Sequence, residues 1–268
     1  MSIENIGIMQ GRLSNVQDND NLDLFPFETW ESEFELANKL GFQTLELVVD
    51  KNLNKNNPIW SAEGKAKIVD CFSRNHLSPY SACLNFIIDF PIYSKPIFEK
   101  VCQCISVLND IGVNLVILPL FEASNPNVHS VKKALCALNM LYSESNFEIV
   151  IESELNAQNT NLFLHNIPGR KIGIVYDIGN TSFLGHSVHE DLYFLEKKIS
   201  HIHLKDKNSV GANVNFGVGI VNFEDFFNHP VIESYHRWFT LETSRGENPT
   251  KSAESNLNFI SMLSNKLV

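Results

Sequence analysis

Three carboxylates and one imidazole lie near the carboxyl ends of four apolar runs in the second half of the chain. Glu152 ends the run that begins at Ile149, Asp177 follows GIVY, His203 lies within HIHLKD, and Glu242 lies within WFTLETSR. Carboxylate oxygens suit hard divalent cations, and one imidazole biases the set toward manganese, cobalt or zinc over calcium. These four residues therefore indicate a site for one divalent metal ion.

Alternation along the expected strands tests whether such residues can point the same way. Side chains at i and i+2 of a strand share a face, so His203 shares one with His201 and Lys205, and Glu242 shares one with Thr240. A lone histidine in a strand is more often an ordinary core residue. An unpaired buried carboxylate costs several kcal/mol, however, so several inward carboxylates are hard to explain structurally. We expect the four candidates to point inward together.

Short apolar runs alternate with amphipathic segments along the whole chain. The expected strands are Asn5–Met9, Thr44–Val49, Leu77–Asn85, Val113–Leu120, Glu148–Glu152, Lys171–Tyr176, Ser200–Lys205 and Arg237–Thr243. The expected helices are Trp30–Leu40, Ser61–Asn75, Lys95–Ile111, Val128–Ser143, Gln158–Ile167, His189–Lys197, Val221–Phe227 and Pro249–Leu263. This pattern predicts an α/β fold, a (β/α)8 TIM barrel forming a single domain over residues 1–268, with its active site at the carboxyl ends of the strands. The alternative, a doubly wound open sheet, usually has an early phosphate-binding glycine turn, which GIMQGRLS lacks.

The composition argues against several other classes of protein. A net charge of −10 argues against non-specific nucleic-acid binding. Five scattered cysteines do not form a disulfide framework, and no stretch approaches the ~18 apolar residues of a membrane span. The first ten residues lack the features of a signal peptide. We therefore expect a cytoplasmic protein without a membrane or nucleic-acid partner; whether it forms a homo-oligomer is left open.

The sequence resembles the xylose isomerase-like barrel superfamily, in particular its sugar-phosphate isomerase/epimerase branch. The stretches that carry the resemblance include GIMQGRLS, GFQTLELVVD, VYDIGNTSFLG, ISHIHLKDK and FTLETSRG, of which YDIGN and HIHLKD are the most specific. The order and spacing of Glu152, Asp177, His203 and Glu242 resemble the ligand order of that family. The resemblance implies one bound divalent ion, Mn²⁺ ahead of Co²⁺, Mg²⁺ or Zn²⁺.

The resemblance also implies an isomerase or epimerase acting on a small ketose or ketose phosphate. The metal ion would stabilise the enediolate formed when a proton leaves the carbon next to the carbonyl. Glu152 and Glu242 would be the catalytic residues that remove and return this proton. A keto-sugar or keto-inositol dehydratase and a non-catalytic sugar-binding barrel are the alternatives. The DNA-repair endonucleases of the superfamily need further histidines, which the ends of the first four expected strands lack.

Five further residues are candidates for binding the substrate. Glu46, in GFQTLE, is expected to orient substrate hydroxyls, and Lys205 to hold a substrate oxygen or to pair with a ligand. Arg12 and Arg245 follow the first and eighth strands and together could cradle a phosphate or a carboxylate. Asn180 falls where some relatives place a substrate-contacting histidine, which leaves the identity of the sugar open.

Overall fold

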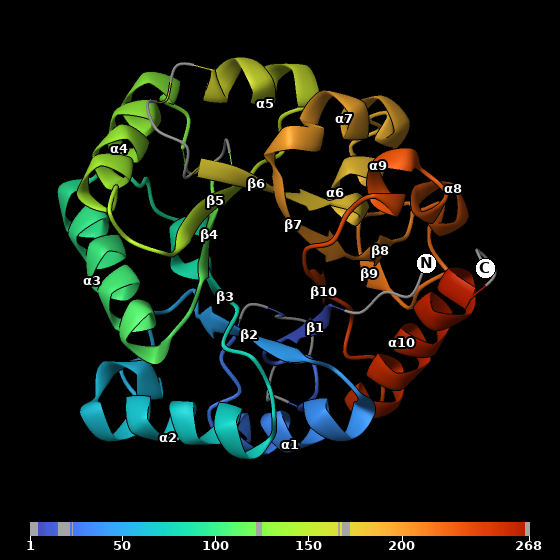
Figure 1. Ribbon diagram of the computed structural model, residues 1–268, viewed down its shortest axis with the longest axis horizontal. Helices are drawn as coiled ribbons and strands as arrows, with labels where there is room; N and C mark the ends of the chain where they lie inside the picture. The colour runs from blue at the N-terminus through green and yellow to red at the C-terminus, as the bar shows by residue number, and fades with distance from the viewer. Residues whose placement is uncertain are drawn as a thin grey trace.

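The computed structural model is a closed ring of parallel strands surrounded by helices (Figure 1). The structure describes residues 5–15, 22, 24–121, 125–165, 167 and 172–265. Within these residues the barrel consists of β1 (Ile6–Met9), β2 (Thr44–Val49), β3 (Ser81–Leu84), β4 (Leu115–Pro119), β5 (Glu148–Glu152), β6 (Ile172–Asp177), β7 (Ile199–Leu204) and β10 (Phe239–Leu241). Around the ring the order is β1-β10-β7-β6-β5-β4-β3-β2. The predicted (β/α)8 barrel is therefore confirmed.

Helices cover the outside of the ring. They are α1 (Trp30–Leu40), α2 (Ala62–Arg74), α3 (Lys95–Ile111), α4 (Val128–Leu141), α5 (Ala157–Leu164), α6 (Ile178–Phe183), α7 (Val188–Leu195), α8 (Phe223–Phe227), α9 (Pro230–Glu233) and α10 (Pro249–Asn265). Single 3₁₀ turns form at η1 (Pro58–Trp60), η2 (Asn85–Ile88) and η3 (Glu196–Lys198), and a small antiparallel hairpin joins β8 (Asp206–Lys207) to β9 (Asn213–Val214). Among the described residues, no helix is long and apolar enough to cross a membrane.

Local sequence signals set several helix ends. Gly41 and Gly112 end α1 and α3, each with φ of 94°, a left-handed conformation that glycine adopts without steric cost. The Ser61 hydroxyl accepts a hydrogen bond from the Gly64 N–H at 2.9 Å and caps α2. Pro249 begins α10, where its missing N–H is not needed. These boundaries match those predicted from the sequence.

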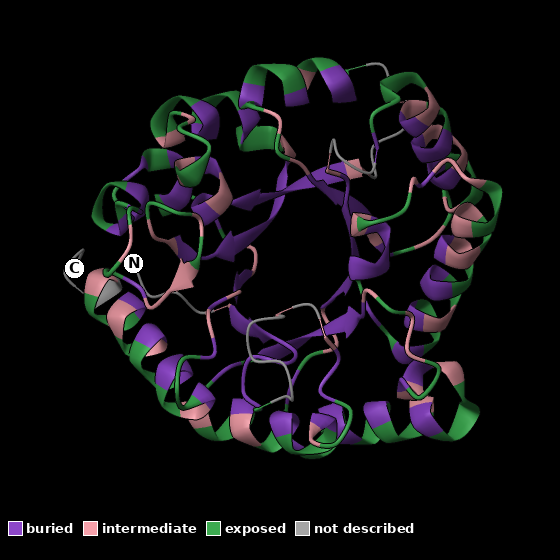
Figure 2. Cartoon of the chain, turned by 180° about the vertical axis from the view of Figure 1, so that it is seen from behind, coloured by how far each residue is buried: buried purple, intermediate pink, exposed green. Residues whose placement is uncertain are grey.

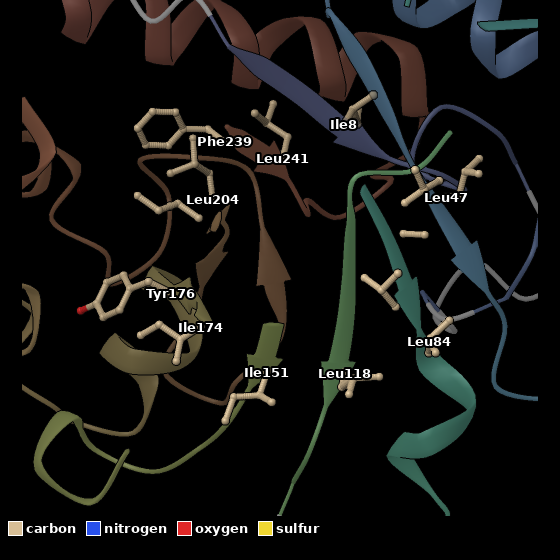
Figure 3. Close-up of a cluster of buried hydrophobic side chains, with 14 of the residues drawn as sticks. Ile8, Leu47, Leu84, Leu118, Ile151, Ile174, Tyr176, Leu204, Phe239 and Leu241 are labelled. Atoms are coloured by element: carbon tan, nitrogen blue, oxygen red, sulfur yellow. The ribbon is translucent and has the colours of Figure 1, made fainter. Parts of the chain in front are cut away.

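The main hydrophobic core lies between the strands and the helices. Buried outward-facing side chains of the strands form it together with the inner faces of the helices, and Figure 2 shows buried strands inside helices whose outer faces are exposed. Figure 3 shows ten strand residues of this layer: Ile8, Leu47, Leu84, Leu118, Ile151, Ile174, Tyr176, Leu204, Phe239 and Leu241. Burial of this layer from water fixes which face of each strand points into the barrel.

The barrel interior contains a small apolar cluster, with polar groups at both ends of the strands. The cluster consists of Met9, Val48, Cys83, Leu115, Ile117, Val150 and Val175. At the amino ends of the strands, Glu148 accepts a hydrogen bond from Ser200 at 2.6 Å and pairs with Arg237. At the carboxyl ends lie the candidate ligands. Val150 and Val175 are the residues two before Glu152 and Asp177, so the predicted alternation is confirmed on β5 and β6.

The structure adds short elements that were not predicted, among them α6, α9 and the β8–β9 hairpin, and it shortens one predicted strand. Helix α6 begins directly after β6, where no helix was predicted, because the Asp177 carboxylate accepts from the Asn180 N–H at 2.7 Å and caps the helix. The segment after β7 forms the β8–β9 hairpin. Strand β3 begins at Ser81 rather than at Leu77; Pro79 interrupts the hydrogen bonding before it. Lys171, the expected start of β6, lies outside the described residues.

Candidate metal centre

The four candidate ligands converge at the carboxyl ends of β5, β6, β7 and β10. Parallel pairing places Asp177 beside His203 on adjacent strands, and the Glu242 N–H donates to the Leu204 carbonyl at 3.0 Å. Glu152, Asp177, His203 and Glu242 each offer one ligand atom, and these atoms all lie within 4.8 Å of one another. The structure therefore brings together all four residues that the sequence selected.

In each of the three carboxylates, one oxygen already contacts a neighbouring group. Asp177 Oδ1 accepts from the Asn180 backbone N–H at 2.7 Å, and Glu152 Oε1 accepts from the Asn180 side-chain amide at 3.0 Å. Glu242 Oε1 lies 3.6 Å from the Arg12 guanidinium. These contacts fix the orientation of the carboxylates and leave the second oxygen of each for another partner.

His203 completes the set through Nδ1. Its Nε2 lies 3.1 Å from Glu46 Oε1, and a proton on Nε2 leaves the Nδ1 lone pair facing the other ligands. Nδ1 lies 3.0 Å from Glu242 Oε2 and 3.9 Å from Glu152 Oε2, yet among the described residues it makes no hydrogen bond. Burial would lower the pKa of His203, but the carboxylates of Glu46 and Glu242 outweigh it and raise that pKa, so an ion that binds Nδ1 replaces a proton there. The donor set thus fits a divalent ion.

Lys205 supplies the nearest positive charge. Its Nζ lies 2.9 Å from Asp177 Oδ2 and 2.9 Å from Glu242 Oε2. Burial, together with the charges of Glu242 and Asp177, raises the pKa of Glu152 to about 7, against the opposing charges of Lys205 and His203. Burial would also raise the pKa of Glu242, but Lys205 and His203 outweigh it and hold that pKa well below its usual range. The two glutamates therefore differ in their readiness to carry a proton.

Glu46 lies beneath His203 rather than at the rim. Its carboxylate accepts from Ser81 at 2.7 Å, from Thr240 at 3.3 Å and from His201 at 3.0 Å, and it contacts His203 at 3.1 Å. Burial would raise the pKa of Glu46, but His203 and His201 outweigh it and lower the pKa. The expected contact with substrate hydroxyls does not fit this position, because β2 continues to Val49 and leaves Glu46 fully buried below the pocket.

Arg12 and Arg245 are both fully buried and do not face the pocket as a pair. The Arg12 guanidinium donates to the Leu22 carbonyl and lies 3.6 Å from Glu242. Arg245 Nε donates to the Gly11 carbonyl at 2.6 Å, and Arg245 also lines the pocket. The structure does not support the predicted joint cradle, because Arg12 binds a ligand residue and the loop after β1 instead.

Glu33 is a supporting residue that the sequence analysis missed. It lies on α1, is fully buried, and its carboxylate accepts from the Gly11 N–H at 2.7 Å and the Leu13 N–H at 3.0 Å. These bonds hold the loop that carries Arg12. Burial raises the pKa of Glu33. The signal was present in the sequence, since Glu33 lies one helical turn before Ala37 on the apolar face of the helix.

A pocket of about 1330 Å³ adjoins the ligand set. Two of the ligands line it. The rest of the lining mixes apolar side chains, such as Met9, Ile88 and Phe121, with amide and cationic groups that can contact a polyhydroxylated or anionic molecule. The lining residues that bear on the site are Glu152, Glu242, Asn180, Lys205, Lys207 and Arg245. Three of the five predicted substrate contacts, Asn180, Lys205 and Arg245, therefore lie at the pocket.

Known proteins resemble this chain in sequence and in structure. It is 26% identical over 218 residues to L-ribulose-5-phosphate 3-epimerase UlaE of Escherichia coli (strain SMS-3-5 / SECEC), and the match covers 75% of this chain and 77% of that protein. The structure of D-allulose 3-epimerase from Methylomonas sp. is similar with a TM-score of 0.73 at 14% identity over 97% of both chains. The IOLI protein, solved with a bound zinc atom, is similar with a TM-score of 0.73 at 13% identity over 98% of both chains.

The two structural likenesses show the fold alone, because both identities are low. The family model described as xylose isomerase-like TIM barrel matches residues 34–262, which is most of the chain. It covers β2 to β10 and all four candidate ligands. This chain belongs to the xylose isomerase-like TIM barrel family.

Proposed function

We propose that this protein is a divalent-metal-dependent isomerase or epimerase of a small ketose or ketose phosphate. The main support is that three carboxylates and one imidazole offer ligand atoms within 4.8 Å of one another, beside a pocket of about 1330 Å³. The names of two relatives agree with this proposal, since one is an L-ribulose-5-phosphate 3-epimerase and the other a D-allulose 3-epimerase.

The ion would be held by Glu152, Asp177, Glu242 and His203 Nδ1. Three hard oxygen donors and one imidazole favour Mn²⁺, with Co²⁺, Mg²⁺ and Zn²⁺ as alternatives. When bound, the ion supplies a Lewis acid that polarises the substrate carbonyl and stabilises negative charge beside it as the neighbouring C–H proton leaves. The zinc atom in one structure of the same fold supports a metal site of this kind.

Glu152 and Glu242 would move the proton. Glu152 ends β5 and Glu242 follows β10. These two strands lie three positions apart in the ring of eight, so the two side chains approach the site from nearly opposite walls. One carboxylate can take the proton from one face of the substrate carbon, and the other can return one to the opposite face, which gives an epimer. Return to the adjacent carbon gives an aldose–ketose isomerisation.

The neighbouring residues would position these groups. Glu46 orients His203, and Asn180 orients Glu152, through the hydrogen bonds that they make in the structure. The Arg12 guanidinium holds Glu242 through Oε1, the oxygen that lies 3.6 Å from it. Asn180, together with Lys205 and Arg245, also lines the pocket and would contact substrate oxygens.

Proton exchange tests the proposal. The Mn²⁺-loaded protein is incubated in deuterated water with each member of a panel of free and phosphorylated ketoses. At least one ketose is expected to exchange the proton next to its carbonyl for deuterium. Glu152→Gln and Glu242→Gln are expected to lower this rate by several orders of magnitude. Glu154→Gln is the matched control, because Glu154 also lines the pocket at the end of β5 but is exposed and outside the ligand set.

The same experiment separates the alternatives. Exchange accompanied by loss of one water from the product would identify a dehydratase, and bound ion with no exchange on any ketose would identify a non-catalytic sugar-binding barrel. A near-normal rate in either glutamine variant would contradict the role assigned to that residue. The cytoplasmic location, and Mn²⁺ as the natural ion, stay predictions.

A further inference from the structure

We propose that Lys205 is a built-in counter-ion of the ligand set, which occupies the site when no divalent ion is bound and leaves it when an ion binds. This inference rests on the proposed metal site. It concerns how the chain stabilises four converging ligands before loading, and it assigns Lys205 a role in ion binding in addition to any contact with substrate.

The ammonium of Lys205 occupies the oxygens that an ion would need. Its Nζ lies 2.9 Å from Asp177 Oδ2 and 2.9 Å from Glu242 Oε2. In both residues the other oxygen has a different partner, since Asp177 Oδ1 accepts from the Asn180 N–H and Glu242 Oε1 faces Arg12. The oxygens that remain for a divalent ion are therefore those that Lys205 contacts.

The fold holds the base of the Lys205 side chain in this place. Lys205 follows β7 two residues after His203, on the same inward face, and is buried. Gly179 of α6 packs directly against it, because a Cβ added to Gly179 would lie 2.8 Å from Lys205 Cβ and 2.8 Å from its carbonyl oxygen. Such close packing fixes the backbone, Cβ and Cγ, and only the outer part of the side chain can turn toward the pocket that Lys205 also lines.

Charge explains why the ammonium is needed and why it must leave. Without a cation, three carboxylates within one small volume repel one another strongly. The Lys205 charge offsets part of this repulsion in the ion-free protein. A divalent ion on the same oxygens would lie next to the ammonium, and two cations sharing ligands repel, so loading requires Nζ to move away.

Replacing Lys205 with methionine, which keeps most of the length and removes the charge, should therefore act in opposite directions on two quantities. Mn²⁺ affinity is expected to rise by about tenfold or more, since a competing cation is removed. Unfolding in EDTA is expected at a lower temperature, since the carboxylates lose their partner. Lys207→Met is the matched control, because Lys207 lines the same pocket but donates to the Gly211 carbonyl at 3.1 Å rather than to a ligand.

Calorimetric titration measures the Mn²⁺ affinity, and thermal unfolding in EDTA measures the stability, of the wild type and both variants. If wild type binds one ion and the Lys205 variant binds it equally or more weakly, the counter-ion proposal is wrong and the metal site stands. If neither the wild type nor either variant binds an ion, both the metal site and the counter-ion proposal are wrong. An effect of Lys207→Met as large as that of Lys205→Met would also overturn the proposal.

A measurement on the wild-type chain covers the case in which the variant fails to fold. Reductive methylation followed by peptide mass spectrometry reports the accessibility of each lysine amine. Lys205 is expected to be protected in EDTA and to react after Mn²⁺ is added, as Nζ turns into the pocket. Lys39, which is exposed on α1, serves as the internal reference and should react equally in both states. Equal protection of Lys205 with and without Mn²⁺ would contradict the proposal.

Discussion

Replacing Glu46 with glutamine should weaken ion binding even though Glu46 is not a ligand. The Glu46 carboxylate contacts His203 Nε2 at 3.1 Å and His201 Nε2 at 3.0 Å, and it accepts from Ser81 at 2.7 Å. A glutamine has nearly the same shape but replaces one acceptor oxygen with an N–H donor, so one of the two imidazoles faces a donor instead of an acceptor. Ser81, Thr240 and His201 all contact Oε2, so the glutamine keeps its oxygen there and turns its N–H toward His203. His203 then loses the partner that fixes its ring and tautomer.

The expected size of the effect follows from this geometry. Loss of a carboxylate partner behind a ligating histidine typically costs about 10- to 100-fold in metal affinity. The buried hydrogen bonds to a charged acceptor are also lost, which should lower the free energy of unfolding of the ion-free protein by about 1.5–3 kcal/mol. Both effects are large enough to measure by Mn²⁺ titration calorimetry and by urea unfolding.

Glu148→Gln is the matched control for this variant. Glu148 is also a carboxylate inside the barrel, but it lies at the amino end, where it accepts from Ser200 at 2.6 Å and pairs with Arg237. This variant should lose stability while its Mn²⁺ affinity stays within about twofold of wild type, because distant sites act independently. Unchanged affinity in Glu46→Gln, or equal loss in both variants, would refute the role of Glu46.

Three other outcomes are expected. Gly179→Ala should lower the free energy of unfolding by about 1–3 kcal/mol in urea titrations, because the new Cβ would lie 2.8 Å from Lys205; wild-type stability would contradict this packing. Glu33→Gln should cost about 1–3 kcal/mol in the same assay, since the amide cannot accept from both N–H groups of the loop after β1, whereas the exposed Glu35→Gln should cost little. The pKa of Glu152 is raised from 4.5 to about 7 in the folded protein, so protonation of Glu152 stabilises the fold. This contribution to the free energy of unfolding, at most ~3 kcal/mol, is complete below pH 4.5 and is lost as the pH rises through 7. The ion-free protein should therefore melt at lower temperature at pH 8 than at pH 6, and Mn²⁺ should bind more tightly at pH 8; the opposite slopes would refute this assignment.

The sequence predicted the barrel because its signals are local and repeat. A short continuous apolar run such as Leu115–Pro119 is typical of a parallel strand covered on both faces, and glycines such as Gly41 and Gly112 end the helices between strands. The four ligands were predictable for a related reason. Each interrupts an apolar strand near its carboxyl end, and alternation fixes the face on which each one lies.

The supporting contacts could not be predicted in the same way. Glu46 was expected to contact the substrate although the predicted strand already continued to Val49, because the sequence does not show that its carboxylate meets His203 inside the barrel. The guanidinium of Arg12 turns to Glu242 rather than to the pocket, and this choice depends on the loop that Glu33 holds across 22 residues of chain. Such hydrogen bonds depend on side-chain positions that only the closed barrel brings together, whereas alternation depends on the backbone alone.

Anomalous diffraction from crystals loaded with Mn²⁺ is the most direct test of the metal centre. One anomalous peak is expected at ~2.0–2.3 Å from one oxygen each of Glu152, Asp177 and Glu242 and from His203 Nδ1. A crystal in which Mn²⁺ binds elsewhere, or in which the four side chains hold no ion at saturating Mn²⁺, would contradict the proposed function.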